Sequence, residues 1–309
     1  MPPDIKSAFI FPAFPHEYPA DPFKGFPDME EIFYFYLKEA AEYIDPDLSG
    51  FSFITNNFLD SEVKTQYLTY IHSCTLSEYF NRNGLSPFFS AGYSMGIYAS
   101  LCHSGAISFT DGLWLIRSAY DAIKLITGDE EFGMCSIIGL SREDIMEIIR
   151  SLNTEAVISN QNSRFAFVLS GRLNDIHDLI NKAKTEGALH THLLKVNLPY
   201  HSTFLNETRE VFREMIKPVI FRKADTGIIS LIDRRIMNEP ADLKKEVTEN
   251  LFSPLNWYKT QLELAKLGVN VFVECGLGDG LTRNARFIEG DFRFYSALDF
   301  MKRIEHGLH

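Results

Sequence analysis

Ser94 is the residue whose neighbours most clearly favour chemistry. It lies in the segment Gly92-Tyr93-Ser94-Met95-Gly96, after the apolar run 89–91 and before a helix-like pattern. Small residues at 92 and 96 allow a sharp turn from strand to helix, which lifts the serine hydroxyl off the strand end. Backbone amides at the start of the helix would then point toward the group that the serine attacks. The segment predicts a nucleophile elbow, although Gly-x-Ser-x-Gly also occurs in ordinary strand-to-helix turns.

A serine nucleophile needs a base within hydrogen-bonding distance, and the chain has nine histidines. His201 is the best placed, because it follows residues 198–200 at the junction between a predicted inserted unit and the larger domain. Small-molecule sites favour such junctions. We therefore predict a Ser94–His201 pair, with local structural hydrogen bonding as the alternative role of any histidine. That structural role is the one expected for His177, His190, His192, His306 and His309.

Helical and strand-like patterns alternate in the two outer parts of the chain, residues 1–132 and 198–309. Apolar runs bounded by Pro or Gly favour buried strands, and apolar residues at helical spacing favour helices that pack on them. This order predicts an α/β-hydrolase-like large subdomain. The expected elements include strands at 8–11, 227–232 and 269–275 and helices at 29–43, 65–81, 204–215, 241–251 and 257–267.

The intervening residues 133–197 show a tighter alternation. Their order is βαββαβ in about 65 residues, which matches a ferredoxin-like unit. We expect this unit to form a small subdomain inserted into the large one. Its strands are expected at 134–138, 156–159, 165–170 and 191–196, and its helices at 141–152 and 173–186.

Composition limits the classes of partner and compartment. The chain has 309 residues, of which 45% are hydrophobic and 23% charged, so a sizeable core is expected. The net charge of −11 argues against nucleic acid or an anionic membrane as a partner. The four cysteines lack C-x-x-C spacing and indicate free thiols, with no metal site. No targeting signal or run of membrane-span length is present, so we expect a cytoplasmic protein.

Several ordered motifs resemble one known family. Residues 92–99 and 105–111 resemble the G-H-S-L-G-E-Y-A and A-G-x-L-S-F-E-D-A patterns of malonyl-CoA:acyl carrier protein transacylases and polyketide synthase acyltransferases. The resemblance covers nearly the full length and identifies the chain as a divergent, stand-alone member. Further matching segments are 11–12 (F-P-G-Q-G-S-Q), 65–66 (T-Q-P-A-L), 139–141 (G-L-S), 157–171, 198–202 (P-x-H), 250–257 (Q-L-x-x-P-V-x-W) and 272–278 (F-v-E-v-G-P-G).

The resemblance implies a role for each residue of the predicted site. Ser94 would be the acylated nucleophile and His201 its base. The backbone amides of Met95 and Phe14 would form the oxyanion hole, since Phe14 keeps its N–H although it replaces the family glutamine. The backbone carbonyl of Asn250 would orient the imidazole, so that this Ser-His dyad needs no carboxylate.

The expected substrate pocket departs from the family pattern at two tyrosines. Tyr93 stands in place of the family histidine, and Tyr200 fills the position before His201. Gln66 and Asn162 would line the pocket, as the corresponding family residues do. Packing roles for the two tyrosines, and ordinary hydrogen bonding for the two amides, remain the alternatives.

The arginine that pairs with the malonyl carboxylate in this family is replaced. Counting without gaps from Ser94 places Ala119 at its position. Arg117 is two residues away, and two helical residues rotate a side chain by about 200°, so it should face elsewhere. A malonyl carboxylate would then be buried without a partner, at a cost of several kcal/mol. We infer that the acyl group lacks a terminal carboxylate.

The resemblance implies ping-pong acyl transfer between phosphopantetheine thioesters, in polyketide or fatty-acid biosynthesis. The substrates would be thioesters of CoA or of holo acyl carrier protein, with no permanently bound cofactor. An acyl hydrolase that clears stalled groups from carrier proteins is the nearest alternative. A malonyl-CoA:acyl carrier protein transacylase, a non-catalytic module that docks carrier protein, and a conventional esterase with a Ser-acid-His triad are the others.

Overall fold

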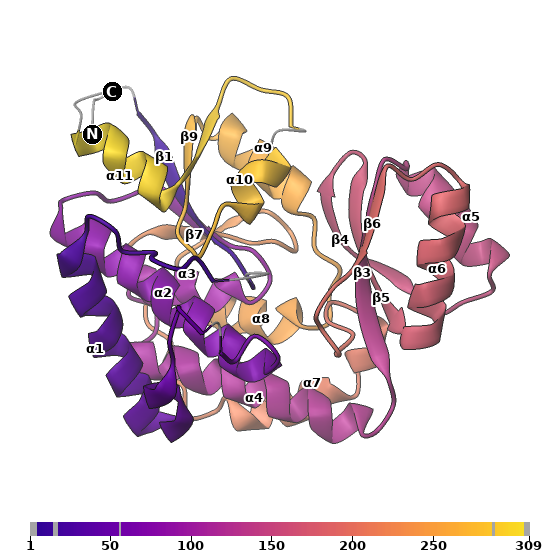
Figure 1. Cartoon of the computed structure of the whole chain (residues 1–309), viewed down its shortest axis with the longest axis horizontal. Coiled ribbons are helices and arrows are strands. Elements are labelled where there is room, and N and C mark those ends of the chain that lie inside the picture. Colours follow the sequence, from indigo (N-terminus) through magenta and orange to yellow (C-terminus); the bar gives the residue numbers. More distant parts are fainter. Residues whose placement is uncertain (1–4, 15–17, 56, 286–287, 306–309) are drawn as a thin grey trace.

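Two β-sheets organise the computed structural model, which describes residues 5–14, 18–55, 57–285 and 288–305 (Figure 1). The larger sheet has six strands in the order β10-β9-β1-β2-β7-β8, and the smaller has four in the order β4-β5-β3-β6. The smaller sheet and its two helices, α5 and α6, form the separate body on the right of Figure 1. No helix of these described residues is long and apolar enough to span a bilayer.

The large sheet is parallel from β10 to β7, and only β8 pairs antiparallel at its edge. Parallel strands end at the same edge of the sheet, which is where open α/β sheets place their sites. That edge brings Phe11, Gly92 and Glu274 together. The strands are β1 (Ser7–Phe11), β2 (Phe89–Gly92), β7 (Gly227–Ile229), β8 (Ile236–Met237), β9 (Val271–Glu274) and β10 (Arg293–Ser296).

Helices cover both faces of the large sheet and bury its strands on both sides. Phe9 and Phe11 of β1 pack in the cluster that includes α1 to α4, whereas Ala8 and Ile10 pack toward Trp257 of α9. The helices are α1 (Pro27–Tyr43), α2 (Glu62–Arg82), α3 (Gly96–His103), α4 (Phe109–Thr127), α7 (Thr208–Met215), α8 (Pro240–Asn250), α9 (Trp257–Lys266), α10 (Gly280–Asn284) and α11 (Ala297–Glu305), with 3-10 turns η1 (Pro46–Gly50) and η2 (Thr203–Leu205).

The small sheet follows the predicted βαββαβ order, and all of its strand pairs are antiparallel. Its elements are β3 (Phe132–Ile138), α5 (Arg142–Ser151), β4 (Val157–Ser163), β5 (Ala166–Arg172), α6 (Leu173–Thr185) and β6 (His190–Leu193).

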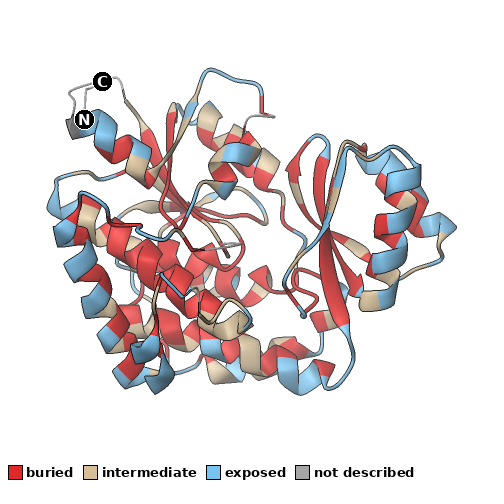
Figure 2. Ribbon diagram, in the orientation of Figure 1, coloured by how far each residue is buried: buried red, intermediate tan, exposed pale blue. Residues whose placement is uncertain are grey.

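The two helices cover one face of the small sheet. Cys135 and Ile137 point into the core that they share with α5 and α6, so Ser136 and Ile138 point the other way. Figure 2 shows this body with exposed outer helices and strands buried between them and the large subdomain. The small sheet therefore turns its helix-free face toward the large sheet.

The fold is an α/β-hydrolase-like large part with a ferredoxin-like insertion, as predicted. Several elements differ in extent from the prediction, among them β7, which ends at Ile229 rather than at 232. Strand β4 continues to Ser163 rather than ending at 159, across two register irregularities that its polar residues accommodate. Strand β6 ends at Leu193 before the Pro199 turn, and the expected helix 204–215 is interrupted, since η2 is a separate turn before α7.

Candidate active site

The nucleophile elbow is built from β2, a tight turn and α3. Gly92 ends β2, Gly96 begins α3, and Ser94 between them has φ 55°. A Cβ on Gly92 would lie 2.2 Å from the backbone nitrogen of Ile97, and one on Gly96 would lie 2.0 Å from the carbonyl oxygen of Phe11. Only glycine fits such contacts with rigid backbone. The two glycines thus let the turn hold Ser94 in a strained, left-handed conformation at the strand end.

Replacing Gly96 with alanine is expected to lower the free energy of unfolding by about 2–3 kcal/mol, because the new methyl group must displace the end of β1. Urea unfolding measures the change. Gly50→Ala is the matched control, since a Cβ there meets nothing within 4 Å. Equal unfolding midpoints for the two variants would contradict this account of the elbow.

The structure brings Ser94 and His201 together, although 107 residues separate them. Ser94 Oγ lies 2.6 Å from Nε2 of His201, and both side chains are buried. On its other side, Nδ1 of His201 lies 2.6 Å from the carbonyl oxygen of Asn250. A carbonyl only accepts, so Nδ1 carries the proton and Nε2 is free to accept from the serine hydroxyl. This is the tautomer that a general base requires.

The backbone holds His201 from both neighbouring elements. His201 has φ 58°, a second strained residue in the same site, and its backbone N–H donates to the carbonyl of Leu251 at 2.9 Å. Asn250 is the last residue of α8, so its carbonyl is among those that a helix end leaves without an internal partner. The negative end of the α8 dipole also favours a positive charge on the imidazole. A helix terminus thus occupies the position, beside the imidazole Nδ1, that a carboxylate occupies in a triad.

Burial lowers the pKa of His201 from 6.5 to about 4, and the hydrogen bond to Asn250 offsets part of that effect. The imidazole is therefore neutral, and able to accept a proton, at any pH well above 4. Protonation would block it as a base. Between about pH 4 and 6.5 the unfolded chain binds a proton at His201 that the folded chain does not. The free energy of unfolding therefore rises with pH across this range.

We expect serine acylation to be independent of pH between about 6 and 8, because the His201 pKa lies below that range. The acylation rate should fall with decreasing pH and reach half its plateau near 4, instead of the 6.5 of an unperturbed histidine. Pre-steady-state rates across pH, with circular dichroism to verify folding at each point, measure this profile. A midpoint at or above 6.5 would contradict the burial argument.

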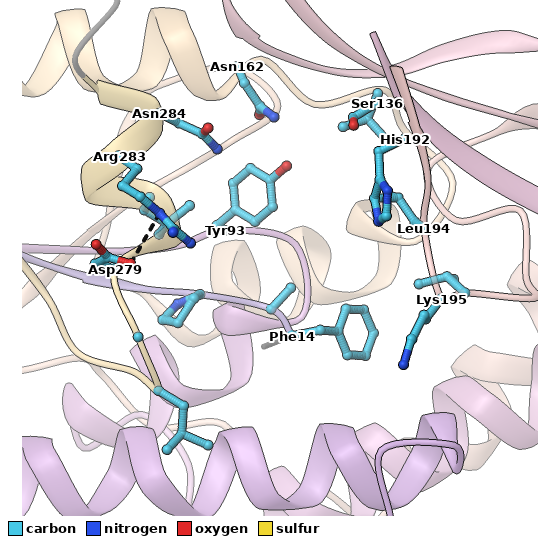
Figure 3. A pocket seen from close by; sticks show the side chains of 18 of the residues that line it. Phe14, Tyr93, Ser136, Asn162, His192, Leu194, Lys195, Asp279, Arg283 and Asn284 are labelled. Atoms are coloured by element: carbon cyan, nitrogen blue, oxygen red, sulfur yellow. Dashed lines mark ion pairs between the residues drawn. The ribbon is translucent and has the colours of Figure 1, made fainter. Parts of the chain in front are cut away.

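A cavity of about 520 Å³ lies between the large sheet and the helix-free face of the small sheet. Its volume is in the range of small-molecule sites. Tyr93, the residue before Ser94, lines it, whereas both residues of the dyad are buried just outside its lining. Phe14, Tyr93 and Asn162 line it, and Figure 3 shows the Tyr93 hydroxyl turned toward Asn162. The ring of Tyr93 packs edge-on against Trp257, with centroids 5.4 Å apart. Burial raises the pKa of Tyr93, so the phenol remains a neutral hydrogen-bonding group.

The other predicted pocket residues, Gln66, Tyr200 and Ala119, do not line this cavity. Gln66 lines a smaller void of about 10 Å³ with Met95, the residue before α3. Its Nε2 donates to the hydroxyl of Tyr200 at 3.0 Å, and both side chains are buried. Ala119 is fully buried in the core and lines neither space.

Arg117 does not enter either space. Its Nε donates to Asp121 at 2.6 Å, and its side chain is nearly half exposed on α4. It therefore forms an i,i+4 ion pair on the surface of α4. This agrees with the expectation that its side chain would not face the position of the family arginine. Among the residues that the structure describes, no group of three His, Cys, Asp or Glu side chains could hold a metal ion.

His190 and His192, for which the sequence predicted only structural hydrogen bonding, line the cavity. His190 and His192 of β6 pair with Ile138 and Ser136, whose side chains face the cavity. Two-residue spacing on a strand was the available signal, but it does not tell which face is open. The two other histidines near the C-terminus, His306 and His309, lie outside the described residues.

Charged residues of the cavity wall also escaped the sequence analysis. They are Glu62 at the start of α2, Lys195 after β6, Asp279 just before α10 and Arg283 within it. Figure 3 shows Arg283 turned to Asp279, and their Nε–Oδ1 distance is 3.1 Å. The α10 segment is anchored by Glu274, whose carboxylate accepts from the amides of Leu281 and Thr282.

Comparison with known proteins finds transacylases. The sequence matches no protein-family profile. It is 29% identical over 213 residues to the malonyl CoA-acyl carrier protein transacylase of Bacillus subtilis, covering 68% of this chain and 67% of that one. The malonyl CoA-acyl carrier protein transacylase of Coxiella burnetii superposes with a TM-score of 0.87 at 21% identity, over 99% of both chains. The chain has the transacylase fold.

A further solved structure of this fold contains a carrier protein. It is a type II polyketide synthase acyl-carrier protein in complex with its malonyl-transacylase. That transacylase superposes on this chain with a TM-score of 0.86 at 20% identity, and the match covers 97% of this chain and 99% of that one.

Proposed function

We propose that the protein is an acyltransferase that moves an acyl group between thioesters of coenzyme A and of acyl carrier protein, through an acyl-Ser94 intermediate. The observation that carries this proposal is the 2.6 Å contact between Ser94 Oγ and His201 Nε2 beside the cavity. The names of the sequence relatives support the same reaction class, in fatty-acid or polyketide biosynthesis. Acyl carrier protein is the protein partner that this function requires.

In the first half-reaction, His201 Nε2 takes the proton of Ser94 as Oγ attacks the thioester carbonyl carbon. The tetrahedral intermediate places its negative oxygen against backbone N–H groups, for which Met95 and Phe14 are the candidates. The carbon–sulfur bond then breaks, and the imidazolium returns the proton to the leaving thiolate. The products are an ester on Ser94, a free thiol and a neutral His201.

The second half-reaction reverses these steps with a new thiol. His201 accepts the proton of the incoming phosphopantetheine thiol, whose sulfur attacks the serine ester. Collapse of the second tetrahedral intermediate returns the proton to Ser94 Oγ and releases the new thioester. The chain needs no permanently bound cofactor for either step, because the phosphopantetheine arm arrives with each substrate.

We further propose that the acyl group lacks a free carboxylate. Ala119 is buried in the core at the position of the family's carboxylate-binding arginine, and Arg117 is paired with Asp121 on the surface. A malonyl carboxylate would therefore have to find another cation or lose its hydration without one.

Within this proposal, residues 133–197 form the small subdomain and residues 1–132 and 198–309 form the large one.

Malonyl transfer is the second candidate, and the names of the relatives favour it. Acetyl-CoA and malonyl-CoA, each supplied with holo acyl carrier protein, separate the two candidates. Faster formation of acetyl carrier protein supports the neutral acyl group, whereas faster malonyl transfer overturns it. Release of free acid as the main product would instead indicate an acyl hydrolase, and no turnover of any thioester would indicate a docking module.

A further inference from the structure

A carboxylate that no family motif includes lines the cavity. Glu62 is the first residue of α2, and its Oε1 accepts a hydrogen bond of 2.7 Å from the hydroxyl of Tyr200. Its Oε2 accepts from the backbone N–H of Asn197 at 3.2 Å. Each oxygen of a carboxylate has two lone pairs, so both retain capacity on the cavity side.

Glu62 is connected to the predicted site by a short chain of hydrogen bonds. Tyr200 precedes His201, and its hydroxyl also accepts from Gln66 Nε2 at 3.0 Å. Gln66 shares a small void with Met95, directly behind the elbow. The carboxylate is therefore held two hydrogen bonds from the residues that surround the nucleophile, on the wall of the cavity.

Several features favour the ionised form of this carboxylate against the effect of burial. Burial raises the pKa of Glu62, but the hydrogen bonds from Tyr200 and Asn197 act against that effect. The amino end of the α2 dipole, 21 residues long, also favours a negative charge in its first turn. Of the groups on α4, Lys124 also lowers the pKa of Glu62. Burial, and then the charges of Glu62 and Asp121, raise the pKa of Tyr120, so this neighbouring phenol is neutral.

Two of the cations near this carboxylate are paired with other acids, whereas Lys195, on the same cavity wall, forms no ion pair within the described residues. Lys64, on the same helix turn, pairs with Asp47 at 2.7 Å. Arg283, across the cavity in Figure 3, pairs with Asp279 at 3.1 Å. An anionic acyl group whose carboxylate lies beside Glu62 would thus meet a like charge in a partly desolvated space, where like charges repel strongly, while Lys195 is the one cavity cation among the described residues that could offset it.

We propose that Glu62 is a specificity-determining residue that disfavours acyl groups ending in a carboxylate. This inference rests on the proposed acyl transfer and extends it, because it assigns discrimination to a charge that is present as well as to an arginine that is absent. It predicts that the negative charge, and not the shape of the side chain, sets the preference.

The test compares malonyl-CoA with acetoacetyl-CoA, which has nearly the same shape but ends in a neutral methyl ketone. At pH 8, wild-type protein should acylate Ser94 from acetoacetyl-CoA about 100-fold faster, and Glu62→Gln should reduce that ratio about tenfold by raising the malonyl rate. A merely structural role for Glu62 would lower both rates together. Glu31→Gln, an exposed change on α1, is the matched control and should keep the wild-type ratio.

Tyr200→Phe separates charge from hydrogen bonding, because it removes the phenolic hydroxyl and leaves the carboxylate. We expect it to keep the wild-type ratio within about threefold. The inference is overturned if wild type uses both thioesters equally, if Glu62→Gln leaves the ratio unchanged, or if Tyr200→Phe shifts it as much. Absence of acyl-Ser94 with every thioester would remove the proposed function itself, whereas an unchanged ratio with normal acylation leaves that function standing.

Discussion

Ser94→Ala is expected to abolish acyl transfer, with kcat/KM lowered by about 10⁴-fold or more. Alanine has no atom that can form the ester, so any residual reaction must be direct attack of the acceptor thiol on the bound thioester. The fold should survive, because Ser94 Oγ contacts His201 in a site that the glycines and the strand ends already shape. Transfer of an acetyl group from acetyl-CoA to holo acyl carrier protein measures the loss.

The matched control for this variant is Ser151→Ala, at the exposed end of α5. It should keep wild-type kcat/KM and thermal stability. If Ser94→Ala retained activity within tenfold of wild type while Ser151→Ala did too, transfer would not proceed through Ser94. The proposed mechanism would then be wrong, although the fold would stand.

His201→Ala is expected to have the second largest effect, a loss of about 10³- to 10⁵-fold in the rate of acylation. Without the imidazole, nothing in the elbow removes the proton of Ser94 Oγ, and the leaving thiolate has no acid. Substrate affinity should change little, because His201 is buried beside the cavity and is not among the residues that line it. Single-turnover acylation by acetyl-CoA separates the chemical step from binding.

His177→Ala is the control for the histidine, since His177 is exposed on α6. It should acylate at the wild-type rate. Full activity in His201→Ala would show that another group serves as the base, and the two cavity histidines, His190 and His192, would be the next residues to replace. If another group were the base, the acylation rate of His201→Ala would also lack the pH midpoint near 4.

The elbow was predictable because local sequence encodes it. A strand, two glycines and a helix fix where Ser94 lies, and the glycines are needed for contacts within five residues or with the adjacent strand β1. The position of His201 was inferred from its place at the end of an inserted unit. The structure places its Nε2 2.6 Å from Ser94 Oγ, with Asn250 behind it.

The far wall of the cavity was not predictable in the same way. His192 and Lys195 reach the cavity only because the small sheet turns its helix-free face toward the large one. That orientation depends on contacts between elements far apart in sequence, and strand alternation alone leaves both faces possible. Asn162 was predicted to line the pocket from the family resemblance, and it does line the cavity, but the extension of β4 through its polar residues was not predicted.

Glu62 was missed for a related reason. An acidic residue in the first turn of a helix is common and needs no function, since the helix dipole favours it there. Its contacts with Tyr200 and Asn197 cross 138 and 135 residues of sequence. Only the folded chain reveals that this carboxylate shares a hydrogen-bond network with a residue next to the predicted base.

Intact-protein mass spectrometry after exposure to acetyl-CoA, followed by peptide mapping, tests the central claim most directly. The account predicts a gain of one acetyl group on the peptide that contains Ser94. Addition of holo acyl carrier protein should remove that group from Ser94 and produce acetyl carrier protein. Formation of acetyl carrier protein while Ser94 is never modified, or stable acetylation at another residue only, would contradict it.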